Sequence, residues 1–203
     1  MDLNWNRLAD EETIAAVSKA MQQKGFDVSI AANGKEAKRI AIGMIPVGSD
    51  VMEASSTTLN QIGVTEEIDG SGKYRSLRKE ITMESDTAAR DALRKRALGA
   101  NYGIGSVQAV TRAGEMVVAS ASGSQVALYA YGAANLILVV GSNKIVENLD
   151  QAFRRVREHS FPLENERANK AYGQGSSINK LLIIEKEKPG RIRVIIVKEA
   201  LGY

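Results

Sequence analysis

Three short groups of small polar residues, each following an apolar strand-like run, are the positions best suited to hold a ligand. Their hydroxyl and amide groups, with free backbone N–H groups where a helix opens, suit a phosphate or a carboxylate. Lys144 would add positive charge to the third group. The groups are Ser55, Ser56, Thr57 and Thr58; Ser120, Ser122, Gly123, Ser124 and Gln125; and Gly141, Ser142, Asn143 and Lys144. Serine and threonine are also ordinary helix caps, so capping without ligand contact stays open for each group.

Catalysis by this chain would have to use carboxylates, lysines or hydroxyls. The only histidine, His159, falls in a predicted helix, which disfavours a Ser-His-Asp hydrolase. Glu53 ends a predicted strand beside the first polar group, and Glu115 begins the strand that leads to the second. Either carboxylate could serve as a nucleophile or a base, although a glutamate in a hairpin is often only a solvated turn residue.

Several classes of cofactor are disfavoured by composition. The chain has no cysteine and one histidine, which leaves no ligands for an iron–sulfur cluster, no disulfide and no His-rich zinc site. The P-loop pattern and a dinucleotide-binding GxGxxG are both missing. We therefore expect no metal and no cofactor held by this chain, with a CoA derivative still possible as a ligand.

Charge and hydropathy argue against nucleic acid and membrane partners. Lys plus Arg number 27 and Asp plus Glu 24, and in the most basic region, residues 73–96, the charges of both signs are interleaved with few aromatics. No apolar run reaches the roughly 18 residues of a membrane span, and residues 1–12 are too polar for a signal peptide. A cytoplasmic protein is the simplest expectation.

Alternating strands and helices predict an α/β fold, a layered α/β/α arrangement around a mainly parallel sheet with antiparallel hairpins. With 203 residues, 44% of them hydrophobic, the chain suits one domain spanning residues 1–203, with a helix in residues 1–25 packed on it. The run at 135–140, apolar throughout, is typical of a strand buried on both faces. Ligands of such sheets bind beyond the C-terminal ends of the strands, where the polar groups are expected.

Local patterns give more detailed expectations. Residues 64–68 (VTEEI) are predicted to form a strand. Two hairpins are also predicted, one from residues 102–111 and 115–120 around Gly114, and a second from residues 180–186 and 192–199. Asn33 and Glu36 form a plausible capping box. Ser122 and Gln125 fit S-x-x-Q, so Ser122 is the predicted cap of a short helix that stops at Gly132.

Several long segments, in order, resemble the LUD-domain family, which is named for lactate utilisation. They are SSTTLNQIG, GIGSVQAVTRAGEMVVASASGSQVALYAYGA, ILVVGSNKIVENLDQAFRRVRE, PLENERANKAYGQGSSINKLLI and PGRIRVIIVKEALGY. The resemblance implies the fold shared by ribose-5-phosphate isomerase, glucosamine-6-phosphate deaminase and CoA-transferases. It also implies a setting in bacterial oxidation of lactate to pyruvate, with iron–sulfur protein partners.

Two departures from the family limit what can be carried over. Some relatives have a cysteine-containing insertion where this chain reads AYGQGSSINK. The lactate-utilisation subunit of the family has an acidic residue and Gly-Thr in the region where this chain reads TRAGEMV. Three hypotheses remain: binding of a small anionic metabolite such as a hydroxy acid, a phosphosugar or a CoA derivative; a CoA-transferase- or sugar-isomerase-type enzyme using Glu53 or Glu115; and a non-catalytic interaction subunit of an iron–sulfur oxidoreductase system. A homo-oligomer is also possible.

Overall fold

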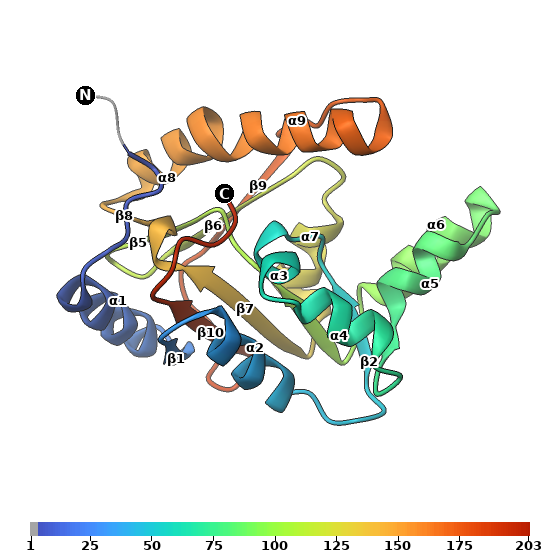
Figure 1. Cartoon of the computed structure of the whole chain (residues 1–203), viewed down its shortest axis with the longest axis horizontal. Helices are drawn as coiled ribbons and strands as arrows, with labels where there is room; N and C mark the ends of the chain where they lie inside the picture. The colour runs from blue at the N-terminus through green and yellow to red at the C-terminus, as the bar shows by residue number, and fades with distance from the viewer. Residues whose placement is uncertain (1–3) are drawn as a thin grey trace.

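A six-stranded parallel sheet forms the centre of the fold (Figure 1). The computed structural model describes residues 4–203, so the first three residues of the predicted 1–203 domain lie outside the described part. The strand order is β1-β10-β7-β4-β2-β3, and every pairing is parallel. The strands are β1 (Asp27–Ala31), β2 (Asp50–Glu53), β3 (Arg75–Ser76), β4 (Tyr102–Gly105), β7 (Asn135–Gly141) and β10 (Ile192–Val197).

A smaller mixed sheet lies beside the first, in the order β8-β5-β6-β9. Its strands are β5 (Ala109–Thr111), β6 (Met116–Ser120), β8 (Ile145–Val146) and β9 (Lys180–Ile184). β6 runs antiparallel to both β5 and β9. Gly114, with φ of 87°, supplies the left-handed turn between β5 and β6.

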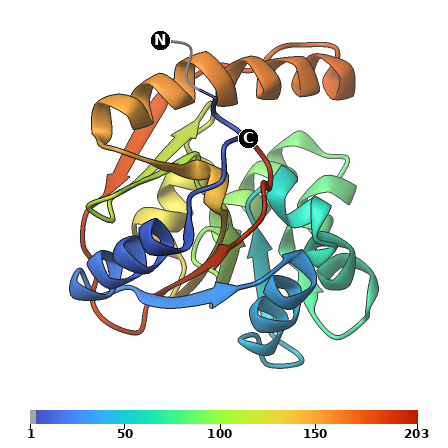
Figure 2. The ribbon, with the colours of Figure 1, turned by 60° about the vertical axis from the view of Figure 1, so that its left-hand side comes forward.

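The helical segments connect and cover these strands (Figure 2). They are α1 (Glu11–Gln23), α2 (Gly34–Gly43), α3 (Thr57–Gln61), α4 (Val64–Gly70), α5 (Leu77–Met83), α6 (Thr87–Ala97), α7 (Ser124–Ala127), α8 (Leu149–Arg155), α9 (Phe161–Tyr172), the π-helical η1 (Leu128–Gly132) and η3 (Val156–Ser160), and the 3-10 turn η2 (Ser142–Lys144). In both views α8, η3 and α9 form one long, continuous helical segment along the edge of the molecule.

The period of two along the strands assigns each side chain to one of the layers. In β7, Ile137 and Val139 join the core beneath α2, α3 and α4, whereas Leu136, Leu138 and Val140 face the opposite core with α1, η1 and the second sheet. α8 covers the outer face of the second sheet in a third cluster. The expected layered α/β/α fold with a mainly parallel sheet is thus confirmed.

Several local expectations are also met. α1 packs Ile14, Val17 and Met21 into the core, and Asn33 accepts a hydrogen bond from the backbone N–H of Glu36 at 3.0 Å, as in a capping box. The hairpin of β5 and β6 forms as expected, while residues 102–105 leave it to become β4 of the central sheet. Among residues 4–203 no helix combines the length and apolarity that crossing a bilayer requires.

Two local predictions are wrong. Residues 64–68 form the first part of helix α4, because Val64 and Ile68 stand four residues apart and are buried together beside α2 and α3. Residues 180–186 and 192–199 do not pair as a hairpin: β9 joins β6 in the second sheet, and β10 lies between β1 and β7. β10 is buried on both faces, which suits a central strand, whereas β9 is largely exposed on one face.

Candidate functional site

A cavity of about 450 Å³ lies where the C-terminal ends of the central strands meet the second sheet. Residues that follow β2, β4 and β7 line one side of it, residues that follow β6 line another, and α5, η3 and α9 supply the remaining walls. The volume falls in the usual range of small-molecule sites, which is roughly 300–1,000 Å³. Its position is the one that parallel α/β sheets favour for ligands.

The three polar groups singled out in the sequence converge here. Ser55, Ser56, Thr57, Thr58, Ser122, Ser124, Gln125 and Lys144 line the cavity. Gly123, with φ of 90°, makes the turn into α7 between two lining serines. Gly141 and Asn143 lie outside the lining: Asn143 Oδ1 accepts a hydrogen bond from the Leu201 N–H at 3.2 Å, and Gly141 leaves room for the backbone at residues 199–201.

The hydroxyl groups of the polar groups differ in the hydrogen bonds that they already make within the protein. Ser56 is the N-cap of α3 and accepts from the Leu59 N–H at 3.3 Å. The predicted cap at Ser122 is wrong: the residue before α7 is Gly123, whose N–H donates to Ser120 Oγ at 3.0 Å, and Ser122 is an exposed residue of the cavity wall. Gly132 does end the following π-helical segment, as expected.

Lys144 is buried although it carries an amine. Only 2% of the residue is exposed, and Nζ lies 3.0 Å from Thr58 Oγ1 and 3.0 Å from Ser106 Oγ. No ion pair joins it to a carboxylate in residues 4–203. Burial, and secondly the nearby Arg155 guanidinium, lower the pKa of Lys144 well below its usual value.

Arg155 is a second buried cation without an acidic partner in residues 4–203. Its Nη1 donates to the Gln108 carbonyl and to Ser160 Oγ, both on residues of the cavity wall. Its Nε and Nη2 have no hydrogen-bond partner in that part of the chain. Burial lowers the pKa of Arg155 to about 10, so the side chain stays protonated at neutral pH. Arg155 and Lys144 also lower the pKa of His159, after burial itself.

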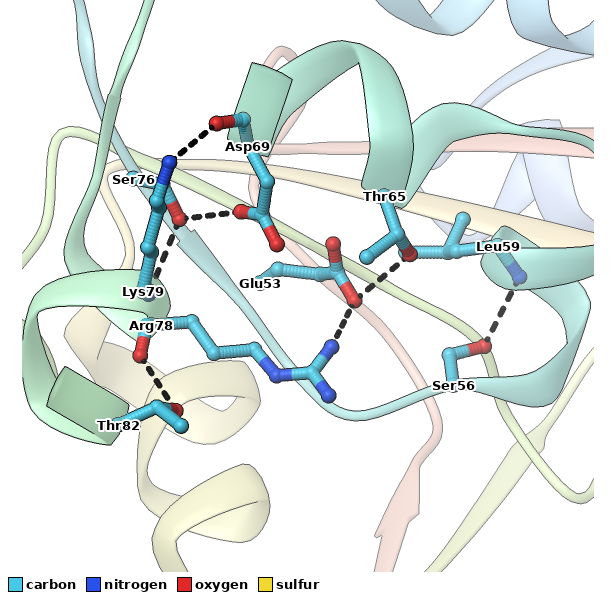
Figure 3. Close-up of polar contacts among 9 residues, drawn as sticks. All are labelled: Glu53, Ser56, Leu59, Thr65, Asp69, Ser76, Arg78, Lys79 and Thr82. Carbon is cyan, nitrogen blue, oxygen red and sulfur yellow. Dashed lines mark hydrogen bonds and ion pairs between the residues drawn. The ribbon is translucent and has the colours of Figure 1, made fainter.

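Glu53 brings a buried carboxylate to the same cavity (Figure 3). Its Oε1 accepts from Thr65 Oγ1 at 3.0 Å and is paired with Arg78, while Oε2 is buried with no partner among residues 4–203. Burial raises the pKa of Glu53, and Arg78 only partly offsets that effect. Two positioned partners and one free oxygen make it suited to proton transfer.

Glu115 lies outside the cavity lining. Its side chain caps the β5–β6 hairpin through Thr111 and pairs with Lys24 at 3.3 Å. Burial pushes the pKa of Glu115 up, but the hydrogen bonds from Thr111, its own N–H and Lys24 outweigh it, and the pKa falls below its usual value. The structure therefore brings one of the two candidate carboxylates, Glu53, to the site.

A buried tyrosine joins the central sheet to the second polar group. Tyr129 Oη donates to the Ser106 carbonyl and accepts from Gln125 Nε2, both at 3.1 Å. Gly105 is required here, because a side chain at that position would overlap the Tyr129 hydroxyl. Burial raises the pKa of Tyr129, so its hydroxyl stays protonated and keeps this geometry.

Several residues of the site were missed from the sequence. Ser106 follows β4 as the other groups follow β2 and β7, so the strand-end rule could have found it. Nothing in the sequence marked Arg78 and Arg155 as site residues, because each stands in a helix rich in charges of both signs. The π-helical segments η1 and η3, which both contribute residues to the wall, have no recognisable pattern in the sequence.

Compared with known protein families, the chain matches the LUD domain over residues 14–197, which is nearly its whole length. The chain belongs to the LUD-domain family. At the level of the family this associates it with lactate utilisation, as the sequence resemblance implied. None of the curated proteins compared matches the chain significantly in sequence.

Solved structures support the fold of the LUD domain. A DUF162 family protein from Deinococcus radiodurans, solved at 1.70 Å, superposes with a TM-score of 0.55 at 14% identity, covering 94% of this chain and 99% of the other. At that identity the likeness shows the fold alone. The beta subunit of eIF2B from Chaetomium thermophilum matches with a TM-score of 0.35 at 16% identity, over 68% of this chain and 47% of the other.

Proposed function

We propose that the cavity binds a small organic anion, a metabolite carrying a carboxylate or a phosphate. The observation that carries the proposal is a pair of buried basic residues with no acidic partner in the described residues: Lys144, which lines the cavity, and Arg155, which is hydrogen-bonded to two residues of its wall. Buried charges in proteins are nearly always paired, because an isolated one costs several kcal/mol. A bound anion would supply the missing negative charge.

The remaining wall of the cavity supports the same chemistry. Hydroxyls and amides from three separate loops line the cavity together with Lys144, and they can hydrogen-bond to carboxylate or phosphate oxygens. Among the described residues, the acidic side chains of the wall are Glu53 and Glu164. They are paired with Arg78 and Arg167, so neither is left as an unmatched negative charge. Hydroxy acids, phosphosugars and acyl groups of CoA derivatives are the ligand classes to examine.

A melting screen tests the proposal. At a ligand concentration of 100 times Kd, binding stabilises a protein by about 2.7 kcal/mol. For a chain of this size that corresponds to a rise in Tm of roughly 5 to 11 °C. Suitable probes are lactate, pyruvate, inorganic phosphate, ribose 5-phosphate and acetyl-CoA.

The control variants are Lys144→Met, which removes the buried cation, and Lys170→Met, which removes an exposed lysine paired with Glu166. We expect the shift in Tm to disappear in the first and persist in the second. If no probe raises the Tm of the wild type, or if Lys144→Met responds as strongly as the wild type, the anion site is refuted.

A second function, proton transfer on the bound ligand, is favoured by one specific observation. Glu53 lines the cavity, has a raised pKa and is anchored at Oε1 by two partners, while its buried Oε2 has no hydrogen-bond partner in residues 4–203 and is left to act as a general base. A sugar isomerase or a CoA-transferase uses a carboxylate in this way, in the first case as a base and in the second as a nucleophile.

Exchange of the ligand's carbon-bound protons in D₂O, followed by NMR, tests the base. We expect exchange in the wild type, loss of it in Glu53→Gln, and full exchange in Glu115→Gln, whose carboxylate lies outside the cavity. Incubation with acyl-CoA followed by hydroxylamine tests the nucleophile. A wild type that neither exchanges protons nor forms an acyl adduct would restrict the site to binding.

A further inference from the structure

The amine of Lys144 is placed as a nucleophile. It projects from the end of β7, through η2, to a cavity large enough for a metabolite. Two hydroxyls, those of Thr58 and Ser106, hold Nζ from different strand ends at 3.0 Å each. If Lys144 only filled space, burying its amine would cost free energy that an apolar side chain of similar length avoids.

The surroundings of Lys144 favour an uncharged amine. It is desolvated, it has no carboxylate partner in residues 4–203, and the Arg155 guanidinium adds like charge to its environment. Desolvation and a neighbouring cation are the two devices that turn a lysine into a nucleophile for carbonyl carbons. His159 lies on η3 and its pKa is lowered, first by burial and then by Arg155 and Lys144; an imidazole is neutral or positive, so it gives Lys144 no counter-ion.

We propose that Lys144 captures a small 2-oxo acid as an imine on Nζ. The inference rests on the proposed function, that the cavity binds an organic anion, and names the class of ligand. A 2-oxo acid carries an electrophilic carbon for the amine of Lys144 and a carboxylate that the hydroxyls of the cavity wall can hydrogen-bond.

The chemistry is balanced without an added oxidant or reductant. The lone pair of Nζ forms a bond to C2 of the ligand, and the carbonyl oxygen takes up a proton to give a carbinolamine. The carbon–oxygen bond then breaks and the oxygen leaves as water, carrying the two protons that Nζ has lost. The hydroxyls of Thr58 and Ser106 lie within reach to exchange protons with the reacting nitrogen.

Reductive trapping tests this step. The protein is incubated with pyruvate and cyanoborohydride, which reduces an imine to a stable secondary amine, and the modified residue is located by mass spectrometry of peptides. We expect one 1-carboxyethyl group, formed on Lys144 at least about tenfold faster than on any exposed lysine, since exposed lysines remain almost wholly protonated at pH 8. Acetone, a carbonyl compound without a carboxylate, should modify Lys144 much more slowly.

The outcomes separate the imine from anion binding. Lactate has a hydroxyl in place of the keto group at C2, so it should raise the Tm as pyruvate does but leave no adduct. If both acids raise the Tm and Lys144 is not modified, the imine is refuted while the proposed function stands. If neither acid raises the Tm and no adduct forms, the imine is refuted, and the proposed function is refuted as well when phosphate, ribose 5-phosphate and acetyl-CoA also leave the Tm unchanged. Lys144→Arg, which keeps a cation but cannot form the imine, should lose the adduct; an equal adduct in that variant also refutes the imine.

Discussion

Replacing Lys144 by methionine should change how the stability of the protein depends on pH. Methionine has a side chain of similar length without a charge, so the substitution removes the buried amine and little of the packing. The lysine is 2% exposed, and its pKa is lowered first by burial and then by the positive charge of Arg155. In the unfolded chain the same amine has a pKa near 10.4.

The sign of the effect follows from proton binding. Between the lowered pKa of the folded state and the higher pKa of the unfolded chain, the unfolded chain binds one more proton at this position. Stability therefore rises as the pH rises through that interval. The slope contributed by one such group is about 1.4 kcal/mol per pH unit, or about 2.7 kcal/mol across two units that lie within the interval.

Urea unfolding at a series of pH values from 7 to 10 measures this contribution. The quantity to compare is the free energy of unfolding of the wild type minus that of Lys144→Met, because the subtraction removes the titration of every other group. We expect the difference to rise with pH and the variant to be the more stable protein at the lower pH values. A difference that stays flat over the whole range would show that Lys144 is charged and compensated in the folded protein, which refutes the reasoning.

Further substitutions test particular contacts in and around the site. Gly105→Ala should destabilise the fold by about 1–3 kcal/mol in urea unfolding, because its methyl would overlap the Tyr129 hydroxyl. Gly43→Ala, where nothing lies within 4 Å, should be neutral or stabilising, and equal effects would contradict the assignment. The pKa of Glu53 is raised, so Glu53 contributes stability that is present below its usual pKa of 4.5 and is lost as the pH rises through its pKa in the folded protein. Glu53→Gln should abolish this fall in stability with rising pH. Glu115→Gln should instead remove stability that is present above pH 4.5, because the pKa of Glu115 is lowered; the same sign in both variants would refute this. Gly202→Ala, with φ of 62°, would press a methyl against Thr58 and Lys144 and should weaken ligand binding, whereas Gly48→Ala carries similar backbone strain with no neighbour and should leave binding unchanged.

The parts of the fold that the sequence predicted are those in which local pattern and burial agree. The run at 135–140 is apolar at every position and forms β7, a central strand buried on both faces. The start of α2 could be read from Asn33 and Glu36, because a capping box depends on residues close in the chain.

The failures occurred where long-range packing decides the outcome. Val64 and Thr65 favour a strand by propensity, yet burial of Val64 with Ile68 against α2 and α3 makes this segment a helix. The segments 180–186 and 192–199 are neighbours in the chain, which favoured a hairpin, but β10 pairs with β1 and β7 instead. No local pattern specifies such a partner.

The candidate site shows the same division. The strand-end rule predicted the groups after β2, β6 and β7, and residues of all three reach the cavity. It could not separate the residue that lines the cavity, Lys144, from Asn143, which holds the backbone at Leu201. Arg155 escaped prediction because its burial depends on the π-helical turn that follows α8. Expectations about iron–sulfur protein partners, a homo-oligomer and the cytoplasm remain predictions.

A crystal structure of the protein saturated with lactate tests the central claim, that the cavity at the strand ends binds an organic anion beside Lys144. We expect the carboxylate within hydrogen-bond distance of Lys144 Nζ or of the hydroxyls of Thr58 and Ser106, in a crystal whose soak concentration saturates the shift in Tm. Lactate bound elsewhere on the protein at that concentration, with the cavity beside Lys144 left without it, would contradict the claim.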